Sequence, residues 1–358
     1  MENTLNSNRN LSIDFLRGIA IFTMLCANVI GYVTPANEHP LWIRFYGSIA
    51  APLFITIAGY MVAYTSANKK HNLNYFIIRG FYILLTGVLM DIFIWRIYPF
   101  TTYDVLYLIG LSIPLVFLFQ KLKINYKLLI IFGVILFSYI MRKYFGYTDY
   151  PIEIDLVTGK RTLSPENQTS IFQHFLIDGW FPILPWIAFS FFGSVIYELA
   201  IKYKNFTSNN SLIISTGLII LGLIWLYILP FSSLLVSREN YSEIFYPPTI
   251  PFILYTFGII LLLWGLVNRI NNFKLLKPIS LLGETSLFIY ILHSLIIKFI
   301  VMPLFVNQDS DKVNGSFITS LVVYFLLYLV CLLSAVIIHF FKTKYKFKNF
   351  LLRFYLGS

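Results

Sequence analysis

Two polar residues of types that assist acyl transfer flank a helix-breaking stretch in the sequence ANVIGYVTPANEH. Asn28 is surrounded by apolar residues, and His39 follows it after Gly31 and Pro35. An imidazole can act as a general base near neutral pH, and a carboxamide can donate a hydrogen bond to a developing oxyanion. Residues eleven apart on a straight helix are separated by about 16 Å, but a chain that unwinds here could bring them together. We therefore hypothesise that Asn28 and His39 form a catalytic pair at one reacting carbon.

Other charged residues lie within or at the ends of apolar segments, where they cost several kcal/mol unless they are paired or face a cavity. Asp14 and Arg17 are three residues apart, so they share one helix face and can pair. They form either a structural ion pair at the membrane interface or a site in which Arg17 holds an anionic group such as a phosphate. Asp91, near the outer end of its segment, either contributes to a site or pairs with Arg96 or Arg44.

Two further stretches carry candidate binding residues. Asp178 and Trp180 stand at the start of the run DGWFPILPW, where they either line an external sugar site or serve as a helix cap and an interfacial ring. His293 falls near the middle of the apolar stretch LLGETSLFIYILHSLIIKF. It either bonds to a neighbouring helix as a neutral imidazole or lines a cavity.

The composition predicts that these residues are held by membrane-spanning helices. Of the 358 residues, 58% are hydrophobic and only 12% are charged, whereas soluble domains carry about 25% charged residues. The apolar blocks are long enough to span the bilayer, which takes about 20 helical residues. The expected fold is an all-α polytopic bundle of about ten helices, near 11–33, 46–66, 76–97, 102–120, 125–143, 180–201, 211–231, 248–267, 279–301 and 317–341.

The distribution of charge predicts how the helices cross the membrane. Alternate connections hold most of the Lys and Arg residues. The positive-inside rule then places both termini in the cytoplasm of a multi-pass protein of the cell membrane, and His39 on the extracytoplasmic side. The basic tail KTKYKFKNFLLRF is expected to lie on anionic lipid rather than to bind nucleic acid.

The whole chain, 1–358, is expected to form one domain, because no internal repeat of 20–50 residues is visible. The one long polar connection, at about 144–179, is predicted to be an external flap over the bundle. Cys26 and Cys331 both lie in apolar blocks, so we expect buried thiols and neither a disulfide nor a metal site.

Three blocks of the sequence, in chain order, resemble the catalytic-domain family of heparan-alpha-glucosaminide N-acetyltransferase. The first is SIDFLRGIAIFTML followed by Asn28, His39 and PLFITIAGY, and it is fairly specific. The others, GWFPILPWIAFSFFG and LLGETSLFIYILHS, are shared with sister families of uncharacterised membrane proteins and with membrane O-acyltransferases. One departure is Tyr107, which stands in YDVLYLIGLS where bacterial relatives often have His.

The resemblance implies a transmembrane acetyltransferase. Acetyl-CoA would supply the acetyl group from the cytosol, and an amino sugar or glycan on the opposite side would accept it. By position, the resemblance implies His39 as the catalytic histidine and Asn28 as its neighbour. The expected substrate-binding residues are Asp91, Asp178, Trp180 and His293, and the expected CoA-binding residues are Asp14, Arg17, Lys69, Lys70 and Arg79.

Other functions remain open from the sequence. The acyl group could go to a hydroxyl of a surface polysaccharide, or the bundle could be a transporter or flippase, or a scaffold without catalysis. Many transporters carry internal repeats, and none is visible here. The expected partners are the glycan acceptor and membrane lipid, with homodimerisation left open and nucleic acid not expected.

Overall fold

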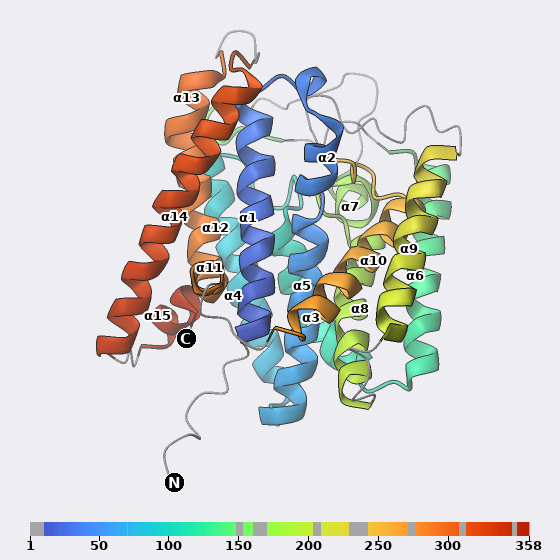
Figure 1. Cartoon of the computed structure of the whole chain (residues 1–358). Coiled ribbons are helices and arrows are strands. Elements are labelled where there is room, and N and C mark those ends of the chain that lie inside the picture. The colour runs from blue at the N-terminus through green and yellow to red at the C-terminus, as the bar shows by residue number, and fades with distance from the viewer. Residues whose placement is uncertain are drawn as a thin grey trace.

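The computed structural model describes residues 11–69, 71–147, 153–159, 170–202, 209–228, 243–270, 276–307, 313–345 and 349–357, which form a helical bundle (Figure 1). The long helices are α1 (Leu11–Val33), α3 (Ala50–Lys69), α4 (Leu73–Met90), α5 (Val105–Phe119), α6 (Ile124–Phe145), α8 (Ile183–Lys202), α9 (Asn209–Ile228), α10 (Ile250–Val267), α12 (Ser286–Ile296) and α14 (Phe317–Tyr345). The short ones are η1 (Ala36–Glu38), α2 (Leu41–Gly47), η2 (Asp91–Trp95), α7 (Ile171–Gln173), η3 (His174–Asp178), α11 (Lys277–Glu284), η4 (Ile297–Val301), α13 (Met302–Phe305) and α15 (Phe350–Leu356). The described residues contain no β-sheet, and the predicted all-α class is confirmed.

Nine helical segments of the described chain are long and apolar enough to cross a membrane. The predicted span near 102–120 is the shorter helix α5, which has 15 residues, fewer than the roughly 20 of a full crossing. Helices α6, α9 and α14 bury only a small part of their surface inside the bundle, whereas α1 is largely buried. The polytopic membrane bundle is therefore confirmed, with α1 near its centre.

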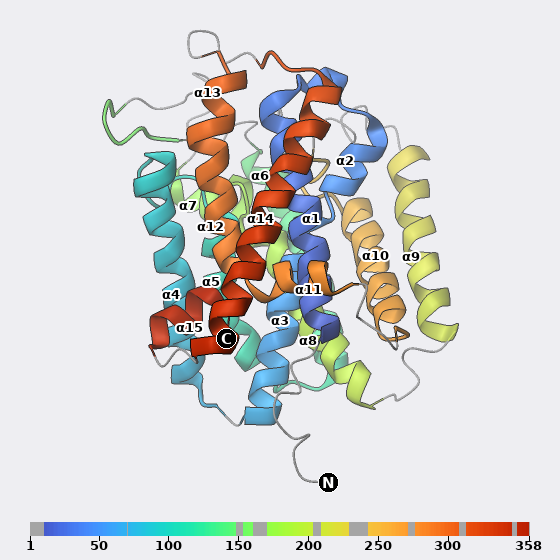
Figure 2. The same ribbon diagram turned by 60° about the vertical axis from the view of Figure 1, so that its left-hand side comes forward.

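Successive long helices alternate in direction, so α1 begins and α14 ends at the same end of the bundle (Figures 1 and 2). We call this the lower end, as drawn in Figure 1, and the end that carries η1 and α13 the upper end. The two described ends of the chain thus lie together at the lower end, and α15 lies there beside α4 and α14.

The predicted helix at 279–301 is not continuous. The chain forms α11, breaks at Thr285, whose φ is −106° and ψ 26°, and then starts α12. Helix α11 lies across α1 rather than along it (Figures 1 and 2). The hydrophobic pattern predicted an apolar segment correctly, but it carried no signal for this change of direction.

Glycines allow the close crossing of α1 and α11. A Cβ atom on Gly283 would lie 1.7 Å from the backbone oxygen of Asp14, and one on Gly18 would lie 1.9 Å from that of Ile279. Small residues are typical of such contacts, because helices in lipid associate through close packing rather than through exclusion of water. The crossing fixes the start of α12, and therefore where its side chains meet α1.

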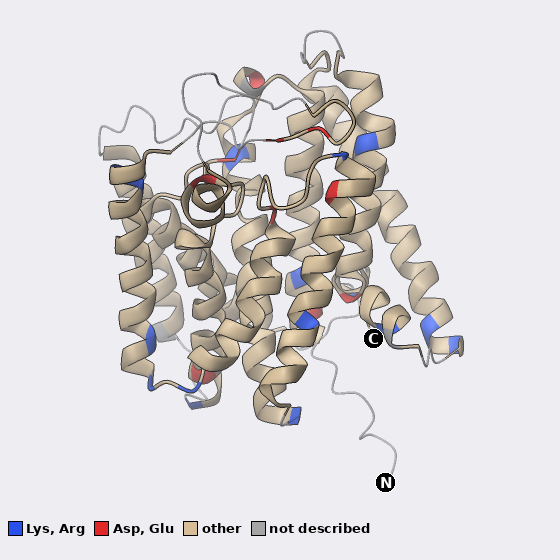
Figure 3. Cartoon of the chain, turned by 180° about the vertical axis from the view of Figure 1, so that it is seen from behind, with Lys and Arg blue, Asp and Glu red and all other residues tan. Residues whose placement is uncertain are grey.

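The described charges divide between the two ends. Most acidic residues lie towards the upper end, whereas Lys and Arg predominate at the lower end (Figure 3). The acidic side chains at the lower end have basic neighbours: Asp14 lies 3.1 Å from Arg17, and Glu198 lies 2.6 Å from Lys127. The lower end is therefore basic and the upper end acidic.

Candidate active site

A cavity of about 1490 Å³ passes through the bundle and is lined by residues from both ends. Its lower part is bounded by the start of α1, the end of α3, the start of α4 and by α15. Its upper part is bounded by the end of α1, by η2, by the residues before α5 and by η4. Pockets for one small ligand usually measure about 300–1,000 Å³, so this cavity has room for two substrates.

The lower mouth contains most of the predicted CoA-binding residues. Asp14, Arg17, Lys69 and Arg79 all line the cavity. Arg17 Nη1 donates to Asp14 Oδ1 at 3.1 Å, so the two residues pair as their spacing predicts. Lys70 lies outside the described residues.

The middle of the cavity contains a polar pair from α1 and α12. The Asn28 amide nitrogen lies 3.1 Å from His293 Nε2. His293 Nδ1 lies 3.1 Å from the backbone oxygen of Ile289. A backbone carbonyl only accepts, so Nδ1 carries the proton and Nε2 accepts from the Asn28 amide. The predicted alternatives for His293 both hold, because it bonds to a neighbouring helix and also lines the cavity.

Asn28 keeps one donor for a ligand. A carboxamide nitrogen has two N–H groups, and one of them is used by His293. His293 is only 2% exposed, and the ring of Tyr290 lies edge-on to it with centroids 5.2 Å apart. The imidazole is therefore held rigidly, and it fixes the rotamer of the amide that faces the cavity.

The upper part of the cavity, which we call the upper chamber, is lined by four acidic side chains and by aromatic rings. Asp104 accepts a hydrogen bond from Tyr290 at 2.7 Å, and Glu153 lies 3.4 Å from the indole nitrogen of Trp180. One lysine lies on the same wall. The acidic and basic residues that line the upper chamber are Asp91, Asp104, Glu153, Glu243 and Lys298. Acidic side chains thus outnumber basic ones on this part of the wall, the reverse of the lower mouth.

Asp91 lines the cavity, which is one of the two alternatives predicted for it. It accepts a 2.5 Å hydrogen bond from the Tyr107 hydroxyl, and the other alternative, an ion pair with Arg96 or Arg44, is not formed. The reason is that the chain turns at Arg96, whose φ is +59°, and the Arg96 carbonyl bonds to the backbone of Leu156. Tyr107, the residue that departs from the pattern of relatives, therefore has a defined polar partner beside the cavity.

Trp180 and Asp178, predicted to act together, have different surroundings. Trp180 lines the cavity, whereas Asp178 is fully buried and is not among the lining residues. Its carboxylate lies 2.7 Å from His174 Nδ1 and accepts from Gln173 Nε2 at 3.2 Å. The structure thus gives Asp178 contacts that hold η3 together rather than a place on the cavity wall.

His39 is separate from Asn28 in this arrangement. Its Nε2 lies 2.8 Å from the backbone oxygen of Thr34, so Nε2 donates and Nδ1 carries the lone pair. The side chain is 7% exposed, and Nδ1 has no hydrogen-bond partner among the described residues. Burial lowers the pKa of His39, against the opposing effect of the Thr34 hydrogen bond. His39 is therefore a neutral imidazole with a vacant acceptor, but it is not among the residues that line the cavity.

The family follows from a comparison with family models. Residues 9–230 match the model described as "Heparan-alpha-glucosaminide N-acetyltransferase, catalytic". The chain belongs to this family. Among curated proteins, none matches the chain.

Membership in the heparan-alpha-glucosaminide N-acetyltransferase catalytic family makes the protein a membrane acyltransferase in the broad sense. The match covers Asn28 and His39 and ends before His293. Two parts of the site were not predicted from the sequence, the Tyr290–Asp104 hydrogen bond and the acidic residues Glu153 and Glu243. Glu153 and Glu243 lie in connecting segments without hydrophobic periodicity, so no pattern indicated that they face the cavity. Among the described residues, no group of three or more potential ligands could hold a metal ion.

Proposed function

We propose that the protein transfers an acetyl group from acetyl-CoA, bound at the lower mouth, to an amine of a sugar or glycan that enters from the upper end. The lower end would face the cytoplasm and the upper end the outside of the cell membrane. The observation that carries this proposal is a cavity that reaches both ends and has opposite charge at each. Membership in the acetyltransferase family supports the same chemistry.

The charge of each mouth suits one substrate. CoA carries several phosphate charges, and Arg and Lys are the side chains that bind phosphate best. An amino sugar is cationic when protonated, and the excess of acidic side chains in the upper chamber would favour its binding. This distribution favours an amine acceptor over the hydroxyl of a neutral polysaccharide.

The transfer itself needs few groups, because a thioester is already activated. The amine nitrogen attacks the carbonyl carbon, its proton passes to a base, and the C–S bond breaks to release CoA. Asn28 is placed to donate its second N–H to the carbonyl oxygen as negative charge develops there. His293 acts as a positioning residue that holds the amide.

We assign the base to His39. Its neutral ring and vacant Nδ1 suit proton abstraction, and the family resemblance implies the same residue. The segment that carries it, 34–40, connects α1 with α2, and both Tyr32 before it and Gly47 after it line the cavity. A movement of this short segment would bring the imidazole to the cavity. His293 is the competing candidate, but its Nε2 is already occupied by Asn28.

A direct assay tests the proposal. Purified protein with labelled acetyl-CoA should acetylate glucosamine-type acceptors, and His39→Ala should abolish this while the protein remains folded. If His39→Ala keeps full turnover, the assignment of the base to His39 is wrong. If the wild-type protein acetylates no amine in a panel of sugars but acetylates a hydroxyl, the proposed acceptor class is wrong.

A further inference from the structure

The C-terminal helix α15 forms part of the wall of the lower mouth. Arg353, Phe354 and Gly357 all line the cavity. The helix packs on α4, where the Tyr355 hydroxyl lies 3.1 Å from Thr86 Oγ1 and the rings of Phe354 and Tyr82 are 5.7 Å apart. The last helix of the chain is therefore a structural part of the cavity and not only an attachment to its outside.

A buried lysine holds this helix in place. Lys342, on α14, donates to Glu284 at the end of α11, and also to the backbone oxygens of Leu356 and Gly357, at 3.1 and 2.7 Å. The side chains of Lys342 and Glu284 are 8% and 9% exposed. Breaking such a buried contact is costly, because it leaves a charge without its partner. We call these three contacts of Lys342 the latch.

The end of α15 fits closely under α11. Gly357 has φ +76°, a conformation that favours glycine. A Cβ atom there would lie 1.9 Å from the backbone oxygen of Glu284. Any side chain larger than hydrogen at position 357 would therefore push α15 away from α11 and away from the mouth.

The latch brings a fourth cation to the mouth. Four helices each contribute one basic residue to the wall of the mouth. These residues are Arg17, Lys69, Arg79 and Arg353. The acidic lining residues here are Asp14 and Glu284, and both have basic neighbours at 3.1 Å or less. The mouth therefore keeps an excess of positive charge for an anion.

A flat pair of rings lies beside these cations. His71 and Tyr75 both line the cavity, and their rings stack with centroids 3.8 Å apart and planes 10° apart. Arg79 Nη1 donates to the Tyr75 hydroxyl at 3.2 Å, which fixes the arginine next to the rings. An aromatic surface next to arginines suits a planar base linked to phosphates.

We propose that α15 completes a nucleotide-binding site at the lower mouth, in which Arg353 binds phosphate, the His71–Tyr75 rings take the adenine, and the latch positions Arg353. This rests on the proposed function, since the nucleotide is that of the acyl donor. The C-terminal helix would then have a binding role, and the two halves of the donor would be bound at different places. The nucleotide half is held at the mouth, and the pantetheine half reaches towards Asn28.

A donor that lacks the nucleotide half gives a selective test of this site. S-acetylpantetheine carries the same thioester as acetyl-CoA but lacks the nucleotide. Arg353→Gln should raise KM for acetyl-CoA about tenfold, the effect of one charge-assisted bond to phosphate at a partly solvated site. It should leave KM and kcat for S-acetylpantetheine unchanged. Arg353→Lys should recover part of the loss.

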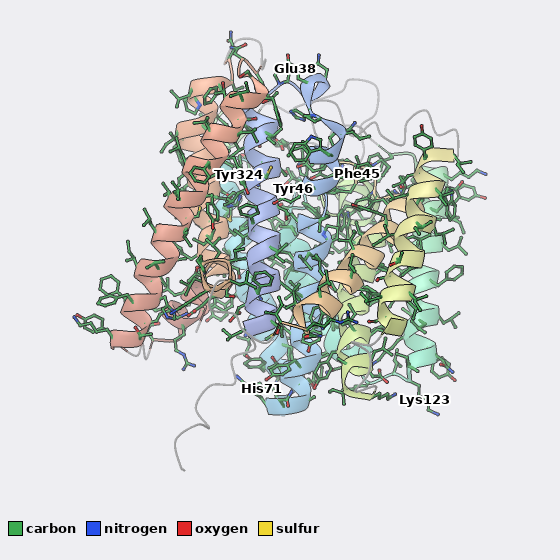
Figure 4. The ribbon with its side chains drawn as sticks, viewed as in Figure 1. Glu38, Phe45, Tyr46, His71, Lys123 and Tyr324 are labelled. Carbon is green, nitrogen blue, oxygen red and sulfur yellow. The ribbon has the colours of Figure 1, made fainter. Side chains whose placement is uncertain are left out.

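A matched control removes a positive charge from the same end of the bundle. Lys123 is exposed at the lower end, under different helices from His71, and it is not among the lining residues (Figure 4). Lys123→Gln should change neither KM. If it raises KM for acetyl-CoA as much as Arg353→Gln does, the effect is one of general charge and the site is refuted.

The latch is tested by non-additivity. Lys342→Met should also raise KM for acetyl-CoA, and combining it with Arg353→Gln should add little, because both act through α15. Additive effects would show that the latch does not position Arg353. Equal KM values for acetyl-CoA in the wild-type protein and in Arg353→Gln would overturn the inference alone. Absence of any transfer from acetyl-CoA by the wild-type protein would instead overturn the proposed function.

Discussion

Asn28→Ala should separate the catalytic role of the amide from its structural role. The substitution removes the 3.1 Å hydrogen bond to His293 and leaves Nε2 of a 2% exposed ring without a partner. Leaving a buried polar group unsatisfied costs about 1–3 kcal/mol of stability. Loss of one oxyanion donor lowers kcat by about 10²–10³. The variant should therefore be less stable and almost inactive.

The double variant Asn28→Leu with His293→Phe supplies the control. Replacing both partners with apolar groups of similar size is close to neutral for stability. The thermal midpoint in detergent should therefore return close to that of the wild-type protein. Acetyl transfer should not return, because no amide faces the thioester.

Two outcomes would contradict a catalytic role for the Asn28 amide. If activity recovers along with stability in the double variant, the Asn28–His293 pair is only structural. If Asn28→Ala retains more than about a tenth of wild-type kcat, the amide does not stabilise the oxyanion to the extent that one such donor should.

Three further predictions follow from the geometry. Glu153→Gln should raise KM for the amine acceptor and leave KM for acetyl-CoA unchanged, since the carboxylate lies in the upper chamber; an effect on the donor alone would contradict the division of the cavity. Gly283→Ala should lower the free energy of unfolding by about 1–3 kcal/mol, because its Cβ would lie 1.7 Å from the Asp14 oxygen. Gly217→Ala, with nothing within 4 Å, should be neutral or stabilising by up to about 1 kcal/mol, and equal losses in thermal unfolding would refute the packing argument. Because burial lowers the pKa of His39, the ring is mainly neutral at pH 6.5 and kcat at saturating acceptor should fall only at lower pH; half-loss of kcat at or above pH 6.5 would contradict this.

The sequence predicted the helices well, because each apolar block carries its own signal of length and hydrophobicity. It also predicted the Asp14–Arg17 pair, because both residues lie on one turn of one helix. These features are local, and local features are the ones that residue spacing determines.

The partners of the cavity residues could not be predicted in the same way. Asn28 and His293 are 265 positions apart, and they meet because α11 crosses α1 through the contact at Gly283 and then turns into α12. Hydrophobic periodicity shows which helix faces are apolar, but not which faces meet. For the same reason, Asn28 was expected beside His39, its neighbour in sequence, whereas the structure pairs it with a distant helix.

In the mechanism proposed here, donor and acceptor meet in one cavity from opposite sides of the membrane. The test uses protein reconstituted in sealed vesicles with its lower end facing outwards. Labelled acetyl-CoA is added outside the vesicles, and glucosamine is enclosed inside them. We expect labelled N-acetylglucosamine to accumulate inside the vesicles, and none to form outside when glucosamine is added there instead. Product formed only on the side that holds acetyl-CoA would contradict it.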